Sequence, residues 1–166
     1  MGTRAFIGRS RRARKLLGGG MRQVGILAAA GLVALRDGPD GMIERLADDH
    51  RNARRLAEGL AAMPGVTGLD PTRARTNFVV FRVGAAPQGR AARRASLELR
   101  GRFLSALAGQ GVLMVEYPDG QVRAVTHYGI EDDDVARTLD ASRRALAAAG
   151  AAPTPSRPAV PVAPGA

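Results

Sequence analysis

Residues 14–35 read RKLLGGGMRQVGILAAAGLVAL, and the rest of the chain is organised around this stretch. Its three glycines, Gly18, Gly19 and Gly20, permit a sharp turn that brings backbone N–H groups close to a ligand. Arg22 follows the turn, and a helix rich in small residues is predicted after it. Because a helix start carries unpaired N–H groups and a partial positive charge, the segment is predicted to bind an anion such as phosphate or carboxylate. A linker turn with a solvated arginine is the alternative at this point.

The composition fits a chain with a real hydrophobic core, since 166 residues suffice for one and Leu, Ile, Val and Ala supply it. The formal net charge of +10 is carried almost wholly by arginine, because Lys15 is the only lysine. A basic balance predicts attraction to anions, although a GC-rich genome also favours arginine over lysine. Cysteine is absent, which excludes disulfides and cysteine-ligated metals and fits a reducing compartment. We therefore expect a cytoplasmic protein without a metal site.

Two classes of partner are not expected from the sequence. No apolar run reaches the ~20 residues that a membrane-spanning helix needs, so we expect no membrane partner. The arginines are not interleaved with aromatic residues that could stack on bases, so we expect no nucleic-acid partner. The Gly-Lys-Ser/Thr signature of a phosphate loop is also missing, which argues against a nucleotide triphosphatase.

Most of the helices are predicted from the spacing of apolar residues. In residues 42–63 these side chains recur three and four positions apart, which is typical of an amphipathic helix. His50 falls on or near the apolar stripe of this helix, where we interpret it as a packing residue rather than a ligand. The small residues of segment 23–36 permit close packing, so this helix is predicted to be buried, with a subunit contact as one way to bury it. Further helices are predicted over residues 5–17, over residues 97–109 with Leu97 facing inward, and from residue 130 onward.

The strands are predicted from β-branched and aromatic runs. Residues 77–83 read NFVVFRV, and this near-continuous apolar character predicts a strand buried on both faces. Residues 66–69 predict a short edge strand. The strands predicted at 112–117 and 121–126 flank Pro118-Asp119-Gly120, which is turn chemistry and predicts an antiparallel hairpin.

The fold class follows from the order of these elements, which is helix, helix, helix, strand, helix, strand, strand, helix. This order predicts an α/β fold of the α+β kind, a small mostly antiparallel sheet backed by helices. Residues 85–94 show no periodic pattern and are predicted to be a loop. Residues 150–166 are rich in Pro and Ala and are predicted to be a disordered tail.

A second candidate anion site is Arg123, which interrupts the apolar strand sequence VRAVTH at residues 122–127. A guanidinium in a half-buried strand requires an anionic partner, because an unpaired buried charge is costly. A bidentate clamp on a substrate carboxylate is one interpretation, and a salt bridge to Glu131 or Asp132 is the other. His127 at the strand end is expected to form a surface hydrogen bond.

Four segments in the same order resemble the C-terminal part of the low-specificity L-threonine aldolases. They are RKLLGGGMRQVGILAAAGLVAL, IERLADDHRNARRLAEGL, TNFVVFRV and VRAVTH, and the resemblance covers roughly residues 6–146. These enzymes are pyridoxal-phosphate lyases of the aspartate-aminotransferase fold type. They cleave β-hydroxy-α-amino acids, such as L-threonine and L-allo-threonine, to glycine and an aldehyde.

The resemblance implies roles for several residues and a domain plan. Arg22, with Gly19 and Gly20, would bind the cofactor phosphate, commonly across a subunit interface; Lys15 would lie near the active site; and Arg123 would hold the substrate carboxylate. An amino-acid substrate and a homo-oligomer, or a large-domain partner chain, are the implied partners. Residues 1–36 would form the end of a large domain with its glycine turn and interface helix, and residues 37–149 the small C-terminal domain of a fold-type-I enzyme.

The chain also departs from the family pattern. The Ser-Lys-Gly segment whose lysine forms the Schiff base does not occur in these 166 residues, and Lys15 corresponds to a different lysine. Pyridoxal chemistry needs that imine and an electron sink. The chain is therefore expected to be a fragment of such an enzyme, inactive alone and able to bind the cofactor only with the missing large domain. The alternative is a non-catalytic interaction module that docks with a large-domain partner chain.

Overall fold

The computed structural model describes residues 2–36 and 41–151. The chain divides into two compact units, Met1–Arg45 and Leu46–Ala166, and the division of the chain into an end of a large domain and a small domain stays a prediction. Residues 37–40 of the predicted helix stop and residues 152–166 of the predicted tail lie outside the described residues. Among the residues that are described, no helix is long and apolar enough to cross a lipid bilayer.

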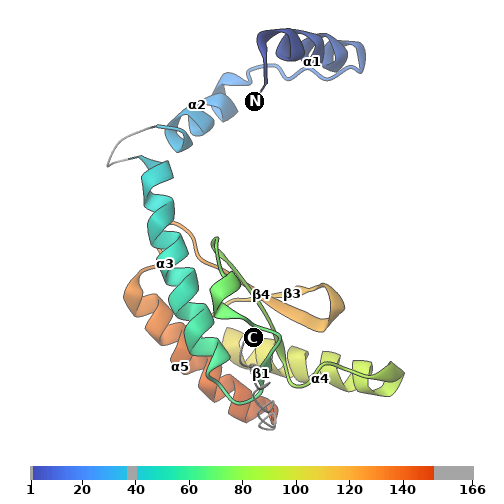
Figure 1. Ribbon diagram of the computed structural model, residues 1–166, viewed down its shortest axis with the longest axis vertical. Helices are drawn as coiled ribbons and strands as arrows, with labels where there is room; N and C mark the ends of the chain where they lie inside the picture. The colour runs from blue at the N-terminus through green and yellow to red at the C-terminus, as the bar shows by residue number, and fades with distance from the viewer. Residues whose placement is uncertain (1, 37–40, 152–166) are drawn as a thin grey trace, which may run out of the picture. The chain divides into compact units, whose positions relative to one another are not determined.

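The first unit contains the two helices predicted around the glycine turn, α1 (Arg4–Leu16) and α2 (Gly25–Ala34) (Figure 1). Thr3 caps α1, and its Oγ1 accepts a hydrogen bond from the Phe6 N–H. Contrary to the prediction, no residue of α2 is buried, and Ile26 and Leu32 are 79% and 72% exposed. The burial prediction was wrong for the single chain because close packing requires a neighbouring surface, and small residues do not supply one.

The second unit is a four-stranded antiparallel sheet with the strand order β1-β2-β4-β3. The hairpin predicted across Pro118-Asp119-Gly120 is confirmed, with the 3-10 turn η2 (Pro118–Gly120) between its strands. The strands are β1 (Val66–Thr67), β2 (Phe78–Val83), β3 (Val115–Tyr117) and β4 (Gln121–Val125). The helices are α3 (Met42–Ala61), which begins in the first unit, α4 (Gly89–Ala108) and α5 (Asp132–Ala149), with the turn η1 (Pro71–Arg73) before β2.

The core lies on one side of this sheet, where α3, α4 and α5 cover it (Figure 1). Phe81 of β2 and Phe103 of α4 are fully buried and meet edge to face, with ring centroids 6.0 Å apart. Helices α3 and α5 approach closely at Gly59, where an added Cβ would lie 2.5 Å from a methyl carbon of Leu139. We call this covered side the inner face of the sheet, and the opposite side the outer face.

Four local predictions were wrong. Strand β2 alternates between buried and more exposed residues instead of being buried on both faces, because the described helices of the second unit pack on the inner face. Helix α4 begins at Gly89, inside the predicted loop, since Ala and Arg are good helix formers. Leu97 and His50 are exposed, and Asp49 is the buried neighbour of His50.

Candidate functional site

The outer face of the sheet carries Arg123 at its centre. In the strand register Arg123 of β4 lies between Val80 of β2 and Val115 of β3, so the three side chains share one face. The neighbouring residues of β4, Val122 and Ala124, point to the inner face and are buried. The period of the strand thus places the guanidinium on the uncovered side of an apolar sheet.

Two aromatic rings hold this guanidinium. The Cζ atom of Arg123 lies 5.3 Å from the ring centroid of Phe78 and 5.6 Å from that of Tyr117. Both distances are within the range of a cation–π interaction. Phe78 comes from β2 and Tyr117 from the end of β3, so strands on both sides of β4 restrict the arginine side chain. The rings hold the charge without neutralising it.

Arg123 has no acidic partner in the described part of the chain. Its Nε is buried without a hydrogen-bond partner, and among residues 2–36 and 41–151 no carboxylate forms an ion pair with it. A buried donor of a charged group that has lost its water costs free energy until an acceptor binds it. The guanidinium can therefore receive an external anion, and its fork of donors matches the two oxygens of a carboxylate.

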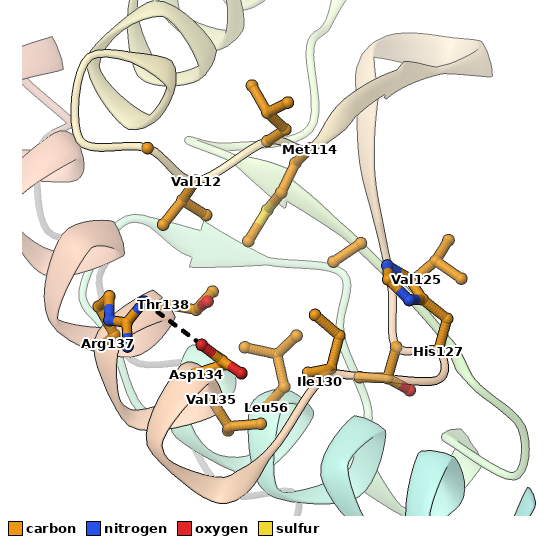
Figure 2. Close-up of a pocket in the computed structure, with 14 residues that line it drawn as sticks. Leu56, Val112, Met114, Val125, His127, Ile130, Asp134, Val135, Arg137 and Thr138 are labelled. Carbon is orange, nitrogen blue, oxygen red and sulfur yellow. Dashed lines mark ion pairs between the residues drawn. The ribbon is translucent and has the colours of Figure 1, made fainter.

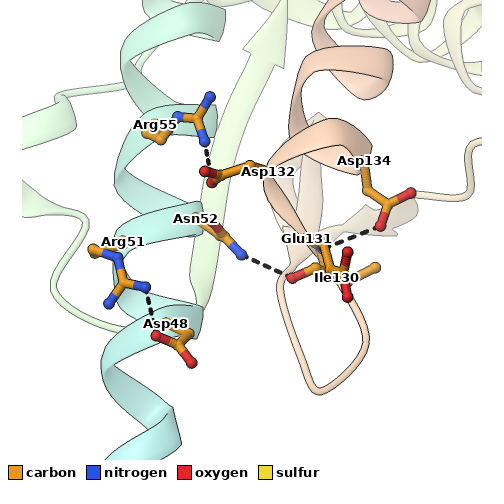
Figure 3. A network of polar contacts seen from close by, with 8 residues as sticks. All are labelled: Asp48, Arg51, Asn52, Arg55, Ile130, Glu131, Asp132 and Asp134. Atoms are coloured by element: carbon orange, nitrogen blue, oxygen red, sulfur yellow. Dashed lines mark hydrogen bonds and ion pairs between the residues drawn. The ribbon is translucent and has the colours of Figure 1, made fainter.

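The alternative predicted from the sequence, a salt bridge from Arg123 to Glu131 or Asp132, does not form because both carboxylates have other partners (Figure 3). Asp132 forms an ion pair with Arg55 of α3. Glu131 caps α5 in a capping box, in which its N–H donates to Asp134 Oδ2 at 3.0 Å. The Asp132–Arg55 pair attaches the start of α5 to α3, and the capping box lies within α5. The interpretation as a salt bridge to Glu131 or Asp132 was wrong.

The glycine turn begins by ending α1. Gly18 adopts a φ of +76°, and its N–H donates to the carbonyl of Lys15, while the N–H of Gly19 donates to that of Arg14 at 2.8 Å. This pair of bonds is a Schellman motif, which explains why Gly18 is a glycine. The N–H of Gly19 is therefore occupied in this conformation, and Gly20 is left as the better candidate of the two for contacting a ligand.

The rest of the turn leads into an uncapped helix. Val24 precedes α2 and forms no side-chain cap hydrogen bond, so the first N–H groups of α2 have no side-chain partner. Gln23 has a φ of +53°, a conformation that is uncommon for residues other than glycine. Arg22 is exposed beside it. The roles of Arg22, Gly19 and Gly20 toward a phosphate, and the place of Lys15 near a site, stay predictions.

A cavity of about 190 Å³ lies on the inner side, between β4 and α5 (Figure 2). Leu56, Val112 and Met114 supply apolar walls, and Asp134 and Arg137 form an ion pair of 3.3 Å at its edge. His127 also lines it, and its Nδ1 lies 2.8 Å from the Tyr128 carbonyl oxygen, which confirms the predicted surface hydrogen bond. No group of three or more His, Cys, Asp or Glu residues that could hold a metal ion occurs in the described ranges.

Sequence reasoning missed Phe78 and Tyr117, the two residues that hold Arg123. Both belong to segments predicted as strands, but their distance from Arg123 depends on the strand order and register. The signal available in the sequence was the alternation in NFVVFRV, which places Phe78 and Val80 on the face opposite to Val79 and Phe81.

Comparison with known proteins gives consistent matches along the chain. The family model described as Beta-eliminating lyase matches residues 1–86. Low-specificity L-threonine aldolase 1 of Arabidopsis thaliana is 33% identical over 146 residues, which cover 88% of this chain and 37% of that protein. Low specificity L-threonine aldolase of Escherichia coli (strain K12) is 46% identical over 84 residues, which cover 51% of this chain and 23% of that protein. The chain thus spans about a third of the Arabidopsis relative.

Proposed function

The chain belongs to the beta-eliminating lyase family, and from that premise we propose that it is part of a pyridoxal-phosphate-dependent aldehyde-lyase. The substrates proposed are L-threonine and L-allo-threonine-type β-hydroxy-α-amino acids, which would be cleaved to glycine and an aldehyde. The names of the relatives from Arabidopsis and Escherichia coli support this reaction. Within it, the chain would supply a carboxylate clamp and a phosphate anchor.

The observation that carries the proposal is the state of Arg123. Its guanidinium is restrained by Phe78 and Tyr117, is half-buried on an apolar face, and has no acidic partner among the described residues. A carboxylate bound there would form charge-assisted hydrogen bonds, which the low local dielectric strengthens. Because the side chain is already held, little conformational entropy is lost on binding. Arg123 would thereby fix the orientation of the substrate α-carbon.

The first unit fits the phosphate end of the cofactor. Arg22 is exposed, the backbone turns at residues 22–24, and the start of α2 has no side-chain cap. These groups together match an anion at a helix start. When bound, pyridoxal phosphate supplies the electron sink for breaking the Cα–Cβ bond. Arg22 would hold the phosphate group, and Lys15 would lie close by in the last turn of α1.

We further propose that the 166-residue chain alone is inactive. Covalent attachment of the cofactor requires a lysine, and the only one in this sequence, Lys15, corresponds by resemblance to a lysine with another role. Incubated with pyridoxal phosphate and L-threonine, the chain is expected to release no glycine. Glycine release by the chain alone, abolished in Lys15→Ala, would contradict this expectation.

A second proposed role is a non-catalytic module that docks with a large-domain partner chain, or with further copies of itself in an oligomer. The exposed apolar residues of α2 support it, since Ile26, Leu27 and Leu32 are 60% exposed or more in the single chain. The two roles differ in one requirement. Docking needs the side chains of α2 and does not need Arg123.

A chimaera tests the enzymatic role. The matching part of the Arabidopsis relative is replaced by this chain, and glycine release from L-threonine and L-allo-threonine is measured. We expect Arg123→Leu to lower kcat/KM about 100-fold or more, since truncating one partner of a buried charge pair is costly. Arg137→Leu is the matched control, because Arg137 forms a surface ion pair with Asp134 on α5, and it is expected to stay within about twofold.

A binding measurement on the isolated chain covers the case in which the chimaera does not fold. The Nε–H resonance of Arg123 is followed by NMR during titration with L-threonine and with L-threoninol, which lacks the carboxylate. We expect L-threonine to shift the resonance and L-threoninol to leave it in place. Equal responses to both compounds, or none to either, would remove the carboxylate-clamp role and leave the docking role.

A further inference from the structure

Three arginines line a surface hollow of about 440 Å³ in the second unit, apart from the Arg123 site. Arg82 reaches it from the end of β2, while Arg90 and Arg93 come from the first two turns of α4. Ala86, Pro87 and Gly89 complete one wall with backbone and small side chains, and Asp119 of η2 is the one acidic residue of the lining. The hollow shares no lining residue with the Arg123 clamp or the glycine turn.

The charges in this hollow are not balanced by its own residues. Three guanidinium groups face one carboxylate, so the lining carries a net charge of about +2. Arg82 donates a hydrogen bond to the backbone carbonyl of Asp119, which orients its side chain without neutralising it. Arg93 lies 3.7 Å from Asp119 Oδ1, a long ion pair between exposed groups. Arg90 forms no hydrogen bond or ion pair with another described residue.

The position of the arginines adds to this imbalance. The start of a helix carries a partial positive charge, which disfavours cations placed in its first turns. Helix α4 has Arg90 and Arg93 there, no acidic residue in its first turn and no side-chain cap. Helix α5 shows the contrary arrangement, with a capping box and Asp132, Asp133 and Asp134 in its first turn. An anion in the hollow would reduce the repulsion between the positive start of α4 and its two arginines. Helix α5 has no such repulsion, because its first turn is acidic.

We propose that this hollow binds the phosphate group of a small phosphorylated metabolite. The planar forks of three arginines suit the several oxygens and the double negative charge of a phosphate monoester. The volume of the hollow leaves room beside the phosphate for part of an organic group. This site is independent of the proposed lyase reaction, because none of its residues is assigned a role in that reaction.

The experiment measures binding to the purified 166-residue chain by calorimetry, with inorganic phosphate and glycerol 3-phosphate as probes at constant chloride concentration. We expect saturable binding of both probes, tighter for the monoester, and a higher Tm in their presence because a ligand stabilises the state it binds. The double variant Arg90→Gln/Arg93→Gln is expected to weaken binding at least tenfold. Its exposed positions leave the core unchanged, which circular dichroism verifies.

Two control variants make the result specific. Arg94→Gln removes the same charge from the same helix, but Arg94 pairs with Glu98 and does not line the hollow, so binding is expected to stay within about twofold. Arg9→Gln removes one exposed charge from the first unit, whose residues do not line the hollow, and is also expected to leave binding intact. Equal losses in Arg94→Gln and the double variant would overturn the site in favour of general attraction to net charge. Absence of binding, or tighter binding of a single-stranded oligonucleotide through the same arginines, would overturn the proposed ligand class.

Discussion

Each side of the sheet carries an arginine that is at least half-buried, but only the one on the inner side has an acidic partner among the described residues. Toward the inner face, Arg100 of α4 forms an ion pair with Glu116 at 2.8 Å and donates to the carbonyls of Tyr117 and Gln121. On the outer face, Arg123 has two aromatic rings and no acceptor in the described chain. The difference indicates that the charge of Arg100 stabilises the fold, whereas that of Arg123 does not. Arg100 joins the β3–β4 hairpin to a helix, whereas Arg123 is held in place with its hydrogen-bonding capacity unused.

The largest expected effect separates the faces through two phenylalanines of one strand. Phe81 is fully buried on the inner face, and Phe78 is 47% exposed on the outer face. We expect Phe81→Ala to lower the free energy of unfolding by about 3–5 kcal/mol, because it leaves a cavity against Phe103. Urea denaturation followed by circular dichroism measures it.

Phe78→Ala is the matched control for this prediction. It removes a half-exposed ring and one cation–π contact, so we expect a loss of about 1 kcal/mol. Similar losses in the two variants would mean that another surface covers the outer face in solution, for instance a second copy of the chain. Both the inner and the outer face of the sheet would then be covered.

A smaller effect is expected from removing Arg100, the ion-paired arginine on the inner side of the sheet. Arg100→Met replaces the aliphatic part of the side chain with an unbranched apolar one and removes its ion pair and its hydrogen bonds to the hairpin. We expect a loss of about 2 kcal/mol, because hydrogen bonds of charged groups contribute about 1.5–3 kcal/mol and the exposed Glu116 carboxylate is rehydrated. Denaturation midpoints at constant m-value measure the change.

The control for Arg100→Met lies on the same helix. Arg94→Met removes an exposed pair with Glu98, four residues along α4, and is expected to change stability by less than about 0.5 kcal/mol. If Arg100→Met proved as mild as Arg94→Met, the inner arginine would not stabilise the hairpin. The contrast with Arg123 would then rest on geometry alone.

The sequence predicts the secondary-structure elements better than it predicts which face of the sheet is covered. Local signals sufficed for most elements, since the turn residues Pro118-Asp119-Gly120 and the apolar spacing of α3 act within a few positions. They also sufficed to identify Arg123 as an arginine out of place in a strand. What covers each face is a long-range property, and a run such as NFVVFRV is equally compatible with one buried face or two. Burial of β2 on both faces was therefore the prediction most exposed to error.

The partners of Arg123 lay beyond the sequence for the same reason. Glu131 and Asp132 are near it along the chain, but β4 ends and the chain turns before α5, so these acids cap the helix and bind Arg55 instead. Phe78 is far from Arg123 in the sequence and becomes its neighbour through the pairing of β2 with β4. Proximity in the sequence favoured the wrong partner, and the strand register supplied the right one.

The smallest expected effect concerns the turn that leads into β2. The side chain of Asp70 accepts hydrogen bonds from the hydroxyl and the backbone N–H of Thr72, and these bonds lower the pKa of Asp70 below its usual 3.8. A carboxyl group whose pKa is lower in the folded state stabilises the fold above its unfolded pKa and loses that contribution as the pH falls through the folded pKa. We therefore expect Asp70→Asn to be slightly less stable than the parent chain at neutral pH, with the difference shrinking below pH 3.8. Thermal denaturation from pH 7 to pH 3 checks the sign.

Because Asp70 and Phe78 line the same hollow beside β2, a change in the Arg123 Nε–H resonance in Asp70→Asn would show that this turn helps to hold the outer face. An unchanged resonance would limit the positioning of Arg123 to its two aromatic neighbours.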